Sequence, residues 1–255
     1  MFRMSSSIRL LTMAVAFASL ITNCPADEGT STSSPKVLNT STEQQKFTYY
    51  FFYRENSAAT KDSLRSLQSN LEPHSEKAGV VSVNVTDPAE RETVTRFKVS
   101  RSPMPLVVAV APNGAVTGAS NTISSKWISD TLVTPHMTEC MKSMQSGKLV
   151  LLCVQGSSTL GLPAGVREFV ADPHFQQRTA VVTMQTTDPN ETRFLKELDV
   201  PATSSNATIV VLMAPPGVLV GKYLETVTGQ QLAGELAAQG KCCNDPNCKH
   251  NKKRK

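Results

Sequence analysis

TDPAERETVTRFKVSRSPMPLVVAVAPNGAVTG, residues 86–118, decides the fold, because the chain repeats it at residues 187–221 as TDPNETRFLKELDVPATSSNATIVVLMAPPGVLVG. Asp87 corresponds to Asp188 and Glu90 to Glu191, both with an offset of 101 residues. After the position that corresponds to Val99, the second copy contains two additional residues. An interval of this length is one small domain rather than a solenoid unit, so the sequence predicts two similar domains in tandem.

Length and composition agree with two separate cores. The chain has 255 residues with 40% hydrophobic content, enough for two domains of about 100 residues each. The formal charge of +5 comes from the ends: residues 241–255 carry +5 and residues 1–23 carry +2, which leaves −2 for residues 24–240. This distribution argues against a nucleic-acid partner.

The first 23 residues have the pattern of a signal peptide. Arg3 and Arg9 precede an apolar run over residues 10–21, LLTMAVAFASLI, which is shorter than the about 20 residues needed to span a bilayer. The sequence therefore predicts export, to a periplasmic or cell-envelope location if the protein is anchored and to the medium otherwise.

Cys24 ends the apolar segment as LITNC, residues 20–24, and this resembles the lipobox of bacterial lipoproteins. In that family the cysteine is acylated and anchors the protein to a membrane. Asn23 departs from the small residue expected there, so cleavage after Ala18 without lipidation is the alternative. Residues 24–45 are rich in Ser and Thr and are predicted to be a flexible linker.

The first domain, residues 46–146, is predicted from hydrophobic patterning and from residues that favour helix starts and turns. Strands are expected over residues 47–53, 80–85 and 106–111, and a helix over residues 60–71. Asp87 and Pro88 supply the N-cap and first position of a second helix, with Val94 and Phe97 inward. Asn113–Gly114 predicts a hairpin, and residues 127–144 a last helix.

The second domain, residues 147–240, repeats this plan. Strands are expected over residues 148–155, 179–183 and 209–214. Helices are expected over residues 162–170, from Asp188, and over residues 230–238.

The order of elements is strand, helix, strand, helix, hairpin and helix, with Met104–Pro105 before the third strand. This order resembles that of the thioredoxin-like superfamily. The resemblance implies an α/β fold of two tandem thioredoxin-like domains, each a central mixed sheet flanked by helices. It also implies that Pro105 is cis and lies beside a groove where an extended peptide docks. The second copy has Thr208 at this position.

The resemblance places a Cys-x-x-Cys pair at the start of the helix after the first strand, where the helix N-terminus lowers the pKa of the first thiol. Here Ser57 and Thr60 occupy these positions, and the second copy has residues 158–161, STLG. The sequence has no cysteine between Cys24 and Cys140. Both domains are therefore predicted to be inactive as dithiol catalysts.

Two cysteines lie within predicted elements. Cys153 is inside the apolar strand LVLLCVQ and is expected to pack as a small hydrophobic residue. Cys140 stands near His136, Met137, Met141 and Met144, a set that could bind Cu(I). Methionines at helical spacing are more often core residues, and this interpretation is favoured.

Residues 241–255 form a basic tail with reactive possibilities. Cys242, Cys243 and Cys248 predict a disulfide first, an exchangeable thiol second, and with His250 a zinc or copper site third. No other cofactor is indicated.

The sequence thus favours a binding or scaffolding protein over an enzyme, with a protein or peptide partner and a lipid anchor. Ser57, Met104 and Pro105 are the candidate binding residues, and no catalytic residue is assigned. The alternative function is thiol–disulfide exchange or metal handling through the tail.

Overall fold

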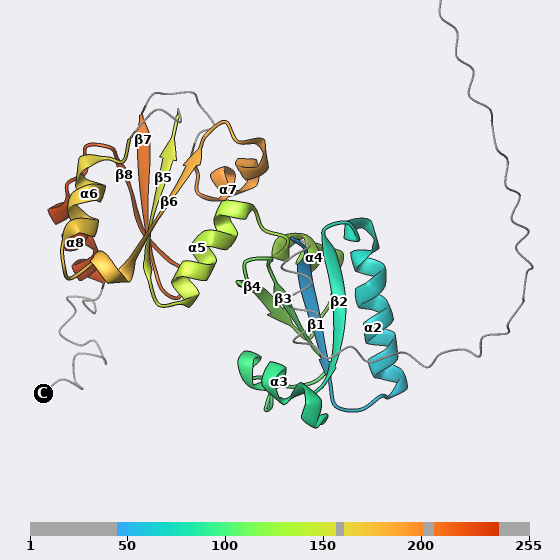
Figure 1. The fold of residues 1–255 in the computed structure, drawn as a ribbon. Helices are drawn as coiled ribbons and strands as arrows, with labels where there is room; N and C mark the ends of the chain where they lie inside the picture. Colours follow the sequence, from blue (N-terminus) through green and yellow to red (C-terminus); the bar gives the residue numbers. More distant parts are fainter. Residues whose placement is uncertain (1–44, 157–160, 201–206, 240–255) are drawn as a thin grey trace, which may run out of the picture. The chain divides into compact units, whose positions relative to one another are not determined.

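The structure is a computed structural model that describes residues 45–156, 161–200 and 207–239. Within these ranges the chain forms two four-stranded sheets, each with helices on both faces (Figure 1). None of the described helices has the length and hydropathy to cross a membrane.

The first sheet has the strand order β2-β1-β3-β4, in which β1 is parallel to β2 and antiparallel to β3. The elements of this domain are β1 (Phe47–Tyr53), α2 (Ala58–Leu71), η1 (Glu72–His74), β2 (Ala78–Asn84), η2 (Pro88–Glu90), α3 (Arg91–Phe97), β3 (Leu106–Val110), β4 (Val116–Ser120) and α4 (Ser125–Thr131).

The central strand β1 explains why residues 47–53 are almost entirely aromatic. Tyr50 and Phe52 face one side of the sheet and pack with Val94 of α3. Tyr49 and Phe51 face the other side, in the cluster that holds α2 and α4. A strand covered on both faces needs large apolar side chains at successive positions rather than at alternate ones.

The second sheet repeats the arrangement, with strand order β6-β5-β7-β8, β5 and β6 parallel and the other pairs antiparallel. The elements are α5 (Pro135–Gln145), β5 (Leu149–Gln155), α6 (Ala164–Ala171), η3 (Gln176–Arg178), β6 (Thr179–Gln185), η4 (Pro189–Glu191), α7 (Thr192–Glu197), β7 (Thr208–Ala214), β8 (Val218–Leu224) and α8 (Gly229–Gln239).

Two clusters lie on opposite faces of the second sheet. Val166 and Phe169 of α6 and Leu232 of α8 pack on one face. On the other face Cys140 of α5 packs with Leu195 of α7. Both domains therefore have a thioredoxin-like fold with a central mixed sheet flanked by helices, as the repeat and the order of elements along the chain predicted.

The prediction of one helix over residues 127–144 is wrong, because the structure has two helices in this range. α4 ends at Thr131, and α5 starts at Pro135 after the N-cap Thr134. Proline lacks an N–H and disfavours helix in the preceding residue, so it starts a helix here instead of continuing one. Cys140 of α5 packs in the core of the second sheet.

Candidate functional site

The candidate binding residues lie at one end of the two central strands of the first sheet, where β1 ends and β3 begins. Phe52 of β1 pairs with Leu106 of β3. The loop after β1 therefore starts beside Pro105. We call residues 54–57 and 98–105 together the β1–β3 edge.

Ser57 is the N-cap of α2 and is exposed. Its Oγ accepts a hydrogen bond from the Thr60 N–H at 3.2 Å and lies 3.1 Å from Thr60 Oγ1. The two hydroxyls thus occupy neighbouring places at a helix N-terminus, as the resemblance implied for Ser57 and Thr60. Hydroxyl groups cannot form a disulfide, so this pair offers hydrogen bonding rather than redox chemistry.

The segment before β3 is held in place by side-chain hydrogen bonds. Asn121 Nδ2 donates to the carbonyl oxygens of Pro103 at 2.8 Å and Pro105 at 2.7 Å, and Arg54 Nη2 donates to the Ser100 carbonyl at 2.6 Å. The Met104–Pro105 peptide is cis, as predicted.

The Met104 main chain differs from that of Pro103 and Pro105, whose carbonyl oxygens accept hydrogen bonds. Within the part of the chain that the structure describes, no hydrogen bond reaches the Met104 N–H or C=O. Its side chain is partly buried against the core under α3. The Met104 N–H and C=O are therefore open to pairing with water or a ligand.

The β1–β3 edge is basic. Arg54, Lys98 and Arg101 are exposed, and Glu55 is the only acidic residue in the two loops. Arg54 donates a hydrogen bond to the carbonyl oxygen of Ser100, and Ser100 lies between Lys98 and Arg101 in the chain. The charges therefore surround the segment that leads to Met104.

The equivalent edge of the second domain is built differently. Thr208 begins β7 at the position of Pro105, and its N–H donates to Glu225 Oε2 at 3.1 Å. The second cis bond of the described residues is Pro215–Pro216, in the β7–β8 hairpin at the other end of β7. The sequence predicted the missing proline at Thr208 but gave no signal for this cis bond.

Both described cysteines are core residues. Burial raises the pKa of the Cys140 thiol to about 12 and that of Cys153 to about 11. They face opposite sides of the second sheet, since Cys140 lies in one cluster and Cys153 in the other. Met137 and Met144 pack against the same core as Cys140, in agreement with the core interpretation of these three residues.

Several predictions concern residues outside the described ranges. They are the signal peptide, the lipid attachment at Cys24, residues 158–160 and the tail with Cys242, Cys243, Cys248 and His250. These stay predictions.

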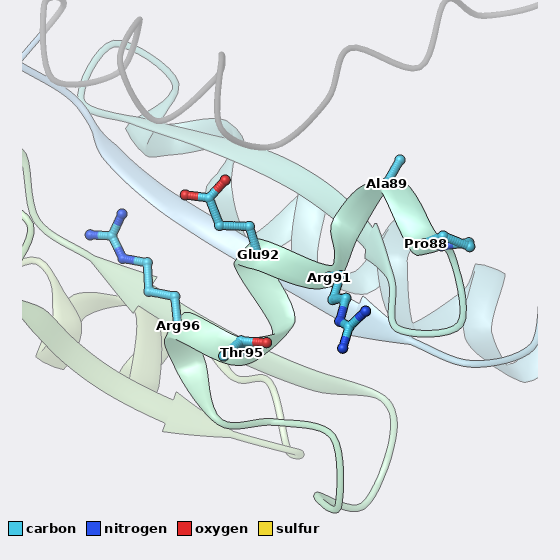
Figure 2. Close-up of a pocket in the computed structure, with 6 residues that line it drawn as sticks. All are labelled: Pro88, Ala89, Arg91, Glu92, Thr95 and Arg96. Atoms are coloured by element: carbon cyan, nitrogen blue, oxygen red, sulfur yellow. The ribbon is translucent and has the colours of Figure 1, made fainter.

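An open depression lies along α3, lined by Pro88, Ala89, Arg91, Glu92, Thr95 and Arg96. Figure 2 shows Glu92 and Arg96 extending from one side of the helix and Arg91 from another. The lining mixes both charge signs on a short helix and contains no grouping of nucleophilic or metal-binding side chains.

His136 makes a contact that the sequence did not predict. Its Nδ1 lies 2.8 Å from Glu191 Oε1, and the two residues are 55 positions apart. The repeated Glu90 and Glu191 were visible in the sequence, but only as the third residue of a helix start. Both are buried, at 5% and 0% exposure. The repetition of a glutamate at equivalent positions of the two copies was the sequence signal that could have indicated a shared buried position.

No protein-family model matches the chain, and no curated protein sequence matches it. Among solved structures, the germline-specific thioredoxin Deadhead of Drosophila melanogaster is 19% identical with a TM-score of 0.33, covering 41% of this chain and 96% of its own. The first two thioredoxin domains of Naumovozyma dairenensis Eps1p are 10% identical with a TM-score of 0.30, covering 87% of this chain and 100% of theirs. Human ERp44 is 10% identical with a TM-score of 0.38, covering 87% of this chain and 58% of its own.

Proposed function

We propose that the protein is an exported, lipid-anchored and redox-inactive pair of thioredoxin-like domains that binds an extended segment of a partner protein. The β1–β3 edge of the first domain is the binding surface. The observation that carries the proposal is the exposed Ser57 hydroxyl on the same edge as the Met104 main chain, whose N–H and C=O make no hydrogen bond among the described residues.

An extended peptide suits this edge because its own backbone offers alternating N–H and C=O groups. Pairing of such a peptide with Met104 would satisfy both of the free groups, as in strand addition. The Asn121 and Arg54 hydrogen bonds fix the segment around Met104 before a ligand arrives. A fixed surface loses less conformational entropy on binding than a mobile one.

The charge of the edge favours a peptide with acidic residues. Arg54, Lys98 and Arg101 outnumber Glu55. These charges are exposed, so their attraction is screened by salt over a Debye length of about 8 Å at physiological ionic strength. Backbone pairing would supply affinity, and the basic residues would supply a preference among sequences.

The same residues support redox inactivity. Ser57 and Thr60 stand where a dithiol would act, and both described cysteines are buried thiols with raised pKa. The alternative function, exchange or metal handling through Cys242, Cys243 and Cys248, depends on the tail outside the described residues.

Random peptides displayed on phage and selected on the full chain test the binding surface. The selected peptides are expected to be enriched in Asp and Glu and to lose at least about tenfold in affinity for Ser57→Trp, because a large ring at the exposed N-cap would cover the edge. Pro105→Ala, which removes a half-buried ring from the same edge, is expected to act in the same direction. Affinities are measured by calorimetry with synthetic peptides.

Ser66→Trp is the matched control, since Ser66 is an exposed serine in the interior of the same helix. It should leave peptide affinity unchanged. Equal affinities for the wild type, Ser57→Trp and Pro105→Ala would place the binding surface elsewhere.

Intact mass of the protein isolated from its own membrane fraction tests the anchor. A mature chain that begins at Cys24 and carries added acyl mass is expected. A chain that begins after Ala18 with no added mass would contradict the lipid anchor while leaving export in place.

A further inference from the structure

Glu191 is buried in the second domain with one oxygen used and one unused. Its Oε1 accepts a hydrogen bond from the His136 N–H at 2.8 Å and lies 2.8 Å from His136 Nδ1. Its Oε2 is buried and has no hydrogen-bond partner among the described residues. Buried carboxylate oxygens are almost always paired, so a partner for Oε2 is expected.

Helix capping accounts for Oε1 only. The N-cap of α5, Thr134, makes no side-chain capping bond, and Glu191 instead accepts the N–H of His136 in the first turn. A carboxylate at a helix N-terminus also interacts favourably with the helix dipole. This structural role is satisfied by one oxygen and leaves Oε2 without a function.

His136 and Asp188 each keep a possible ligand atom that has no hydrogen-bond partner among the described residues. With Nδ1 directed at Glu191, the second ring nitrogen of His136 is available, and the His136 side chain is 27% exposed. Asp188 uses Oδ1 to accept from the Asn190 N–H at 2.9 Å, and no described hydrogen bond engages its other oxygen. One ligand atom from each of the three residues lies within 4.8 Å of the others.

We propose that His136, Asp188 and Glu191 bind a divalent transition-metal ion, with Zn²⁺ as the best match. Imidazole nitrogen together with carboxylate oxygen is a zinc donor set, whereas Mg²⁺ and Ca²⁺ prefer oxygen ligands alone. The ligand atoms must approach to roughly 3.3 Å from one another for tetrahedral Zn²⁺ with bonds of about 2.0 Å. This approach requires rotation of the partly exposed His136 and Asp188 side chains from their present positions.

The site has access to solvent. A surface cavity of about 360 Å³ is lined by His136 and Asp188 and by polar residues of β6 and the turn after it, among them Thr183, Gln185 and Thr187. Water can therefore complete the coordination of the ion. The two carboxylates balance the charge of a divalent cation, which favours its retention at a half-buried position.

The first domain contains a matched site without the imidazole. Asp87 Oδ1 accepts from the Ala89 N–H at 2.8 Å, and Glu90 Oε2 is buried without a described partner, as in the second domain. The described residues place no histidine beside Asp87 and Glu90. An unpaired glutamate oxygen is thus common to both domains, and His136 is what distinguishes the second.

Zn²⁺ titration by calorimetry tests the proposal on the full chain with Cys242, Cys243 and Cys248 changed to Ser, so that tail thiolates do not contribute. Asp188→Asn is expected to weaken Zn²⁺ binding at least about tenfold, while Asp87→Asn, the equivalent change in the first domain, leaves it unchanged. Asn is also a good N-cap, so both variants should fold. His136→Gln is a second variant with the same expected loss.

A separate measurement identifies the ligand directly. Ring resonances of His136 in nitrogen-edited NMR spectra should shift with added Zn²⁺, while those of His74 and His174 should not. Equal Zn²⁺ affinity for Asp188→Asn and Asp87→Asn, or no binding once the tail cysteines are removed, would overturn the proposal.

Discussion

The double variant Ser57→Cys/Thr60→Cys is expected to form a reversible disulfide and to gain dithiol exchange activity relative to the wild type. The two hydroxyl oxygens are 3.1 Å apart at the N-terminus of α2. A thiol placed there should have a pKa lowered from about 8.5 into the range of about 3.5–7.5 by the helix N-terminus. Insulin reduction with a dithiol reductant, compared with the wild type, measures the gain.

The matched control is Ser63→Cys/Ser66→Cys, which has the same spacing in the interior of α2. Interior N–H groups of a helix are already hydrogen-bonded, so thiols there should keep ordinary pKa values and show no such gain. All variants carry Ser in place of Cys242, Cys243 and Cys248.

Two outcomes would contradict the interpretation. A folded Ser57→Cys/Thr60→Cys variant with no more activity than the control would mean that Ser57 and Thr60 do not stand at the dithiol positions. Activity in the tail-substituted chain before any thiol is introduced in α2 would contradict redox inactivity.

The variant Gly165→Ala is expected to lower the free energy of unfolding of the second domain by about 2–3 kcal/mol. A Cβ at this position would overlap the Val227 carbonyl oxygen and would lie 2.8 Å from the Cα of Thr228. Both contacts are with backbone of the two residues just before α8, which cannot rotate away as a side chain can. Steric overlap therefore outweighs the about 1 kcal/mol that alanine gains over glycine in a helix.

Gly234→Ala is the control, because Gly234 lies in α8 and a methyl group added there would meet no atom within 4 Å. It should stabilise the domain by about 0.5–1 kcal/mol. Hydrogen exchange of the β5 amides reports the second domain, whereas fluorescence of Trp127, the only tryptophan, reports the first. Equal protection of β5 in the two variants would show that the α6–α8 contact yields to a methyl group.

The residues of the β1–β3 edge were predictable because their positions are set by local sequence. Ser57 caps a helix that begins at the next residue, and Pro105 precedes a strand of five buried residues. The hydrogen bonds that hold this edge were not predictable. Asn121 reaches back 18 and 16 residues to the carbonyls of Pro103 and Pro105, and nothing near Asn121 in the sequence indicates that role.

The placement of α5 shows a different limit. Its apolar positions predicted a helix but the break at Pro135 was missed, and a helical pattern does not say which of two neighbouring sheets the helix covers. The choice depends on the fit of Cys140, Met137 and Met144 against the second core.

By itself the sequence determined the repeat, the strands of both copies, and the hydroxyl residues Ser57 and Thr60 near the start of α2. Each of these depends on interactions between residues close in the chain or on a comparison of one copy with the other. Only the tertiary structure decided that Glu191 caps α5 and contacts the His136 ring, because these two residues are 55 positions apart. The packing of α5 against the core formed with β5 and β6 brings them together, and no local sequence pattern records that contact.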